Sequence, residues 1–315
     1  MSTADGPVVG VDVGGTKILA RTVDPRTGAA GKRVKVATPT DGPDAVLAAT
    51  IETIKALDGY ADATAVGVGL PGMVVGANTV TSCANIAGWD HPIAVGDEIA
   101  SALGRPVVVA NDVNCGAVAE HRLGAGRGCA DMLAVFVGTG VGGGLILDNA
   151  LVEGGRGLTG EIGHVTVVPD GRPCAYGRGC LEAYAGRAGM ERQARELAAA
   201  GRPNRLVELA GSGAMKSRHF ERAIEEGDEV AVELLAEAAW ALALVIGNMA
   251  TMLDLQRVVL GGGVVDKFGQ TFLDQIVASP TFGGFGPDVC ELHLAERLDD
   301  AGVVGAAMLA SDQRG

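Results

Sequence analysis

The sequence contains no run of lysine and arginine and no basic stripe of the kind that binds nucleic acid. Its 315 residues include 25 Lys and Arg against 38 Asp and Glu, which gives a formal net charge of −13 at pH 7. Such a chain repels a polyphosphate backbone, and we expect no nucleic-acid partner. Net charge does not exclude a nucleotide ligand, because glycine loops and a metal ion can hold phosphates inside an acidic protein.

The sequence also lacks the segments that direct a chain into or across a membrane. The first 14 residues hold no cationic stretch followed by an apolar core, so they do not resemble a secretory signal. The two longest apolar segments, 132–147 and 238–255, are interrupted by glycine, threonine or asparagine and give no continuous membrane span. We therefore expect a cytoplasmic protein with no membrane partner.

Cysteine is scarce, with six residues in the chain. In a long chain without a secretory signal, this number indicates free, buried or metal-binding thiols rather than a disulfide framework. Only Cys174 and Cys180 lie in a compact cluster of potential metal ligands.

Glycine, in contrast, is abundant: it supplies 49 of 315 residues, where about 7% is usual. Many backbone positions must therefore need unusual dihedrals or close approach. Hydrophobic periodicity predicts an α/β chain in which strands alternate with helices. Strands are expected at 8–13, 18–23, 65–70, 106–110, 132–147 (two strands around a bend) and 257–260, and helices at 44–57, 97–103, 182–200, 228–253 and 302–312.

The turn of the first predicted hairpin carries groups that suit phosphate. Asp12 ends a buried strand, Gly14 and Gly15 leave the backbone bare, and Thr16 and Lys17 add a hydroxyl and an ammonium. Backbone N–H groups, hydroxyl and ammonium suit phosphate oxygens, and the carboxylate suits a hydrated Mg²⁺. A plain β-hairpin with a glycine turn is the alternative interpretation.

A second glycine loop, 138–144, has two interpretations. It matches the dinucleotide fingerprint G-x-G-x-x-G, which indicates an NAD-dependent enzyme if a helix begins at the loop. Residues 145–147 instead continue as an apolar strand, so we expect a hairpin tip that holds phosphate. The glycines at 261–263 fit a structural turn and a contact with the adenosine equally well.

Two pairs of polar residues are candidates for chemistry. Asn111 and Asp112 follow a buried strand, at the edge where α/β proteins bind ligands, and Asp112 could accept a hydroxyl proton. A helix cap is the alternative. Glu161 and His164 lie three residues apart, so one helical turn would direct both to a common point.

Together, the segments 12–17, 111–112, 138–144, 161–164 and 174–182 resemble the ROK family (repressors, open reading frames and sugar kinases), over Val8 to about Ala310. The family signature is E-x-G-H followed by C-x-C-G-x-x-G-C-x-E. The resemblance implies an actin-like ATPase (ribonuclease H-like) fold of two lobes with a ligand cleft between them. We place a small α/β lobe at 1–112, joined by the C-terminal helix 303–315, and a larger α/β lobe at 113–302.

The resemblance also implies the activity, an ATP-dependent hexose kinase that phosphorylates the 6-hydroxyl of glucose or a glucose-like sugar, with Mg²⁺ accompanying ATP. Asp112 would then be the general base. The residues that would bind the sugar are Asn85, Asn111, Glu161, His164 and Glu182. The residues that would face the nucleotide are Asp12, Gly14, Gly15, Thr16, Lys17, Gly138, Thr139, Gly140 and Gly262.

The cysteine cluster departs from the family pattern. It is one residue shorter, and Tyr176 stands where a second cysteine is expected. Structural zinc in the family uses the histidine and three cysteines, which leaves His164, Cys174 and Cys180 as metal ligands here. Because a closed zinc site takes four ligands, we predict little bound zinc, with packing or a hydrogen bond from Tyr176 holding His164 and Glu182 instead.

A sugar-sensing repressor of the same family is the alternative from another class. It needs a helix-turn-helix before the sugar domain, and only eleven residues precede Asp12, so we do not expect one. The acceptor stays open between glucose-like hexoses and amino sugars such as kanosamine, glucosamine or an N-acetylhexosamine, and the donor between ATP and polyphosphate. We expect a homodimer or a homotetramer.

Overall fold

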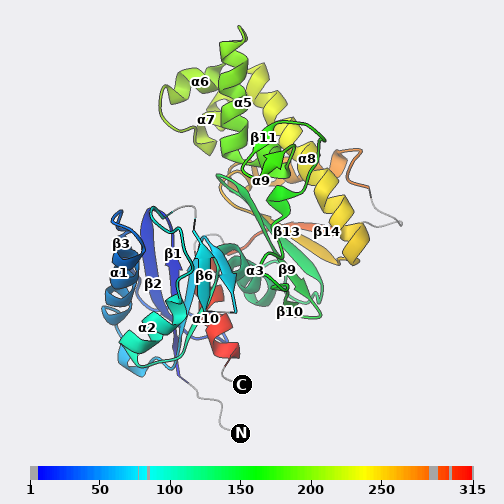
Figure 1. Cartoon of the computed structure of the whole chain (residues 1–315). Coiled ribbons are helices and arrows are strands. Elements are labelled where there is room, and N and C mark those ends of the chain that lie inside the picture. Colours follow the sequence, from blue (N-terminus) through cyan, green and yellow to red (C-terminus); the bar gives the residue numbers. More distant parts are fainter. Residues whose placement is uncertain (1–5, 77, 84–85, 284–289, 298–299, 314–315) are drawn as a thin grey trace.

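The computed structural model describes residues 6–76, 78–83, 86–283, 290–297 and 300–313. Two five-stranded sheets form the centres of two lobes (Figure 1). The first sheet has the order β3-β2-β1-β4-β7, with strands β1 (Val8–Val13), β2 (Lys17–Val23), β3 (Val34–Ala37), β4 (Val66–Leu70) and β7 (Val107–Asn111). A separate two-stranded sheet beside it pairs β5 (Met73–Val75) with β6 (Thr79–Ser82).

The second sheet repeats the plan of the first. Its order is β10-β9-β8-β13-β14, with strands β8 (Met132–Val137), β9 (Val141–Leu147), β10 (Ala150–Leu151), β13 (Arg257–Gly261) and β14 (Glu291–Leu294). In each sheet three strands pair antiparallel and the remaining strands pair parallel. Both sheets therefore present a glycine hairpin beside the carboxyl ends of parallel strands, where ligands bind.

Helices cover the sheets on the outside. In the first lobe, α1 (Pro43–Lys55) packs on β1 and β2, and α2 (Val95–Leu103) packs on β7. The second lobe carries the remaining outer helices, which are α4 (Leu181–Ala185), α5 (Arg187–Ala199), α6 (Arg205–Ala210), α7 (Ser217–Glu225), α8 (Glu229–Leu253) and α9 (Val265–Ala278). Figure 1 shows α5, α6 and α7 together at the end of this lobe away from the first sheet.

Within the described ranges, α8 is the one helix whose length and apolar composition would suit a membrane span. Of its apolar window, 67% is buried inside the fold. Its side chains form part of the hydrophobic core of the second lobe, where it packs on α4 and α9. This burial is typical of the core helix of a globular domain.

Two helices lie between the sheets. The helix α3 (Asp112–Leu123) contacts β7 and β9, and α10 (Ala301–Asp312) packs on α3, β1 and β4 (Figure 1). Glycine permits this approach: a Cβ at Gly67 would lie 1.8 Å from the carbonyl oxygen of Ala306, and one at Gly305 would lie 1.7 Å from that of Cys115. The C-terminal helix is therefore part of the first lobe's sheet packing and also contacts the helix that leads into the second lobe.

Most of the predicted elements are confirmed, with ends shifted by one or two residues. The helix expected at 182–200 is wrong in one respect, because it is two helices separated by Gly186, whose backbone is extended (φ −69°, ψ 138°). Several elements were not predicted, including α3, α7, α9 and β14.

Candidate active site

Two aspartates lie at the carboxyl ends of strands of the first sheet. Asp12 is next to last in β1, and Asp112 begins α3 directly after β7. Both line a pocket of about 230 Å³, together with Phe136 of the second sheet and Gly302 at the start of α10. The pocket is therefore lined by residues of both lobes.

The surroundings of the pocket raise the pKa of both carboxyl groups. Burial raises the pKa of Asp112 to about 6, and the negative charges of Asp12 and Glu161 act in the same direction. The Val113 N–H donates a hydrogen bond to Asp112 Oδ1 (2.9 Å), which opposes the rise. Burial also raises the pKa of Asp12, against the attraction of Lys17. A carboxyl group that titrates near neutral pH can both take and release a proton there, as a general base must.

Asn111 holds the helix that carries Asp112. Its Oδ1 accepts from the N–H groups of Val113 (2.9 Å) and Asn114 (3.3 Å), and its Nδ2 donates to Gly72 O (3.2 Å). The helix-cap interpretation is thus correct for Asn111. One N–H of the Asn111 amide remains for a ligand, because the amide has two and one is used.

The turn after β1 exposes the groups expected to meet phosphate. The Gly14 N–H donates to Lys17 O (2.8 Å), and Thr38 Oγ1 donates to Gly14 O (2.5 Å). These two hydrogen bonds hold the backbone of the turn at Gly14. Gly15, Thr16 and Lys17 are exposed at its outer side.

The turn between β8 and β9 is supported by a carboxylate. Glu182 Oε2 accepts the Val141 N–H (2.9 Å), and a Cβ at Gly140 would lie 2.1 Å from the same oxygen. Across the tip, the Gly138 N–H donates to Gly140 O (2.9 Å). Glu182, expected to bind sugar, therefore lies against the hairpin tip and holds it.

The strand that follows this turn decides between the two interpretations of the loop. β9 continues to Leu147, and its residues Val141–Ile146 pair antiparallel with the whole of β8. The hairpin expected from the sequence is confirmed. The geometry of the NAD fingerprint, which requires a helix at this point, does not occur here.

His164 ends a short 3-10 turn, η2 (Ile162–His164), and Glu161 directly precedes this turn. Glu161 Oε2 is 3.8 Å from His164 Nε2. His164 Nδ1, on the other edge of the ring, is buried and has no hydrogen-bond partner in the described part of the chain. The Tyr176 ring contacts the His164 ring edge to face, with centroids 5.0 Å apart. Of the two expectations for Tyr176, packing on His164 is therefore the one observed.

The expectation that the cysteines are free is wrong for one pair. Strands β11 (Pro173–Cys174) and β12 (Gly177–Arg178) form a small hairpin that turns the chain back, and Cys174 and Cys180, with Cα atoms 6.3 Å apart, form a disulfide. Cys115, Cys129 and Cys290 are free thiols.

The Cys174–Cys180 disulfide also affects the expected zinc site. With both sulfurs bonded to each other and the Tyr176 side chain 82% exposed, only the imidazole of the expected set is available. No group of three or more His, Cys, Asp or Glu residues that could hold a metal occurs within the described ranges. In this form the residues do not fit a closed zinc site, which needs four ligands.

Two further residues expected to contact ligands are Gly262 and Asn85. Gly262 follows β13 with φ +88°, and a Cβ there would lie 2.7 Å from the backbone of Val137, so the turn itself requires glycine. This supports the structural interpretation of that residue and leaves the adenosine contact open. Asn85 lies outside the described residues.

Sequence analysis missed one contact of the second hairpin. Arg187 Nη2 donates to Thr139 Oγ1 (2.6 Å). The two residues are 48 positions apart, and the sequence carries no signal that would pair them. Glu182, 41 positions from Val141, is a similar case.

The chain is similar to sugar kinases over nearly its whole length. The model of the ROK family matches residues 8–313. A glucokinase of Streptomyces coelicolor is 35% identical over 316 residues, which cover 98% of each chain. The crystal structure of a ROK family glucokinase from Streptomyces griseus in complex with glucose and AMPPNP has a TM-score of 0.80 and 36% identity, covering 98% of this chain and 100% of that one. An N-acetylmannosamine kinase of Salmonella newport is 31% identical over 304 residues, 95% of this chain and 97% of its own.

Proposed function

Because the chain belongs to the ROK family and is a sugar kinase of the actin-like ATPase fold, we propose that it transfers the γ-phosphoryl group of ATP to the 6-hydroxyl of glucose or a glucose-like hexose. The observation that carries the proposal is the pocket between the lobes, where Asp12 and Asp112 lie together. The S. griseus relative, similar over the whole chain, binds glucose and a nucleotide analogue in its crystal structure.

Asp112 acts as the general base in this proposal. Its ionised carboxylate accepts the proton of the 6-hydroxyl as the hydroxyl oxygen attacks the γ-phosphorus. The bond between that phosphorus and the β,γ-bridging oxygen breaks, and ADP leaves with the electron pair. A pKa of about 6 keeps Asp112 mostly ionised at neutral pH yet basic enough to take the proton.

Asp12 suits a Mg²⁺ ion that arrives with ATP. Its carboxylate is partly buried beside a second carboxylate, and this burial raises its pKa, so a divalent cation would relieve an unfavourable charge. Kinase sites usually hold Mg²⁺ by one or two carboxylates plus substrate phosphates, and the ion neutralises charge on the transferred group.

The two hairpins and the turn after β13 are proposed to bind the nucleotide. The exposed turn after β1 offers N–H groups, a hydroxyl and an ammonium to phosphate oxygens, and the tip after β8 offers a hydroxyl. The proposed nucleotide residues are those predicted from the sequence, namely Asp12, Gly14, Gly15, Thr16, Lys17, Gly138, Thr139, Gly140 and Gly262.

The sugar is proposed to bind Asn85, Asn111, Glu161, His164 and Glu182. Glu161 lies close enough to Asp112 to influence its pKa, which supports a ligand shared between them. Glu182 Oε2 is used by the Val141 N–H, so a sugar hydroxyl would meet its other oxygen.

An ATP-coupled assay over a panel of hexoses tests this function, with Asp112→Asn as the diagnostic variant. The variant should lose at least about a hundredfold in kcat, while its affinity for the sugar changes much less, because a general base acts in the transition state. Asp58→Asn, an exposed aspartate of the first lobe, is the matched control and should keep full activity. A near-normal kcat for Asp112→Asn would show that the base is another group.

An amino sugar is the second candidate acceptor. Asp12, Asp112 and Glu161 concentrate negative charge at the pocket, and an ammonium would gain charge-assisted hydrogen bonds there. The similarity to an N-acetylmannosamine kinase also supports a modified hexose. The panel therefore includes glucosamine and kanosamine, at a pH where their amines are protonated, and N-acetylhexosamines, whose amides are uncharged. A strong preference for glucose over every amino sugar, unchanged in Glu161→Gln, would contradict the amino-sugar proposal and leave glucose as the acceptor.

We also propose that the enzyme works in the cytoplasm as a homodimer or homotetramer. Light scattering of the purified protein measures its mass directly. A mass of one chain at all concentrations would rule out both assemblies.

A further inference from the structure

The amino-terminal end of α5 is bound to the tip of the second hairpin. The Arg187 N–H donates to Gly138 O (3.1 Å), and the Ala188 N–H donates to Thr139 O (2.9 Å). The Arg187 side chain adds the 2.6 Å hydrogen bond from Nη2 to Thr139 Oγ1. Three hydrogen bonds thus fix the tip that is proposed to hold phosphate.

The same guanidinium reaches a second segment. Arg187 Nη1 donates to Met215 O, two residues before α7. The N–H of Met215 donates in turn to Glu191 Oε2 (2.9 Å), one helical turn after Arg187. Met215 is fully buried and is held from both sides by α5.

The start of α7 faces the glycine turn after β13. A Cβ at Gly263 would lie 3.8 Å from Ser217 Oγ, and the neighbouring Gly262 packs on the end of β8. Arg187 therefore links the tip of the second hairpin to the segment that leads into α7. The start of α7 faces the glycine turn after β13, which is also proposed to bind the nucleotide.

The hydrogen bond to Thr139 has a chemical consequence. A hydroxyl group has one proton, and when its oxygen accepts from a guanidinium, that proton must donate elsewhere. Thr139 is exposed at the tip, so a phosphate oxygen can meet it. A neighbouring positive charge also makes the hydroxyl a better donor to an anion.

Further cations lie nearby in this acidic chain. The pKa of His219 is lowered, first by burial and then by the positive charges of Arg218, Lys216 and Arg187, while Glu191 opposes them. The start of α7 and the start of α5 thus form a local positive region.

We propose that Arg187 is a positioning residue for the phosphoryl donor, which directs the Thr139 hydroxyl toward a phosphate oxygen of the bound nucleoside triphosphate. This inference rests on the proposed function, and it adds a residue outside the glycine loops to the nucleotide site. Arg187 is charged and bidentate, so neither glutamine nor lysine reproduces both of its contacts.

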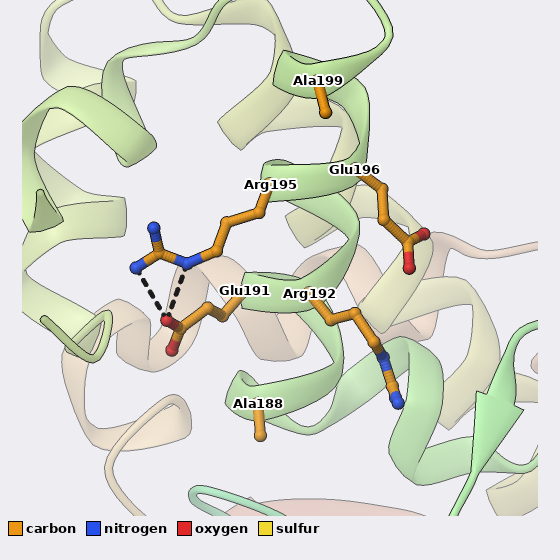
Figure 2. Close-up of a pocket in the computed structure, with 6 residues that line it drawn as sticks. All are labelled: Ala188, Glu191, Arg192, Arg195, Glu196 and Ala199. Atoms are coloured by element: carbon orange, nitrogen blue, oxygen red, sulfur yellow. Dashed lines mark hydrogen bonds and ion pairs between the residues drawn. The ribbon is translucent and has the colours of Figure 1, made fainter. Parts of the chain in front are cut away.

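The rest of α5 provides a matched control. Figure 2 shows the open groove along this helix, with Arg195 bonded to Glu191 on one side and Arg192 on the other. Arg195 also donates to Gly211 O and Gly213 O, so it holds the following loop. Arg192 is exposed, and Arg192→Gln removes one positive charge from the same helix without touching the hairpin.

Binding of AMPPNP, measured by calorimetry in the full chain, tests the inference without turnover. Arg187→Gln should weaken binding at least about tenfold, and Arg187→Lys should recover part of the loss. The KM for ATP should rise similarly, with the KM for the hexose unchanged. Arg192→Gln should bind like the wild type.

A double-mutant cycle separates positioning from a structural role. Because Arg187 acts through the Thr139 hydroxyl, Arg187→Gln combined with Thr139→Val should lose little more affinity than Thr139→Val alone. Additive losses, or binding by Arg187→Gln within about twofold of wild type, would overturn the inference and leave the kinase proposal intact. A wild-type chain that phosphorylates no hexose and binds no AMPPNP would overturn both.

Discussion

Asp112 combines burial with neighbouring negative charge, and both raise its pKa to about 6. Because only the ionised carboxylate can accept a proton, kcat/KM should rise with pH through about 6 and level off above it. Glu161 contributes to the rise, so Glu161→Gln should move the acidic limb of the profile to lower pH. The measurement is a pH profile of kcat/KM for the sugar. A flat profile between pH 5 and 8 in the wild type (a window about one unit below and two above this pKa) would contradict the assignment.

The zinc content is a second prediction at the residue scale. Protein made in zinc-supplemented medium should carry well under one zinc per chain, because Tyr176 replaces a thiol and Cys174 is bonded to Cys180. Metal analysis after chromatography in a buffer free of reductant and chelator measures it. Tyr176→Cys, which returns a third cysteine, is the comparison and should bind more zinc. One tightly held zinc in the wild type, with unfolding on chelation, would show that another side chain completes the site.

The positions of residues were predictable where they depend on local sequence. Asp112 follows a buried strand, and its place at the strand edge could be inferred from that pattern alone. The contacts of Glu182 and Arg187 could not, because their partners lie 41 and 48 residues away and are brought near only by packing. The Cys174 disulfide depends on a short hairpin of two-residue strands, which hydrophobic periodicity cannot detect.

At the scale of elements, hydrophobic periodicity predicted the long or strongly apolar segments. β1 and β8 are nearly continuous runs of buried residues, and α8 is a long apolar helix with 13 of its 25 residues buried, so their composition alone identifies them. The helix α3 contains polar residues and a glycine, and its stability comes from contacts with both lobes. The break at Gly186 was also missed, since an isolated glycine does not by itself end a helix.

The packing of α10 on the first sheet gives a prediction for one element contact. Gly67→Ala would bring a methyl group within 1.8 Å of Ala306 O, so α10 must move away from β4. We expect a loss of at least about 2 kcal/mol in the free energy of unfolding. Chemical denaturation measures this loss. Gly155→Ala, where nothing lies within 4 Å, is the control and should unfold like the wild type. Equal stability of the two variants would mean that α10 is not packed as described.

At the scale of the whole molecule, the buried carboxylate of Glu120 connects α3 with the segment that precedes α10. Glu120 of α3 accepts the N–H groups of Ala125 (2.9 Å), Glu296 (3.2 Å) and Arg297 (2.6 Å), the last two in the segment before α10. It is fully buried. The helices α3 and α10 are thus held together away from the pocket, while their amino-terminal ends carry Asp112 and contact Asp12.

The division expected from the sequence, with residues 1–112 and 303–315 in one lobe and 113–302 in the other, remains a prediction, and we expect the two lobes to move against each other. Sugar and nucleotide would contact both lobes at the pocket, so their binding energy favours a closed arrangement over an open one. We expect the radius of gyration, measured by small-angle X-ray scattering, to fall when glucose and AMPPNP are added together. Glucose with Asp112→Ala should still produce part of the change, because the carboxylate is needed for proton transfer more than for closure. Scattering curves that superimpose with and without ligands, at concentrations that calorimetry shows to be saturating, would mean that the lobes bind both substrates without closing.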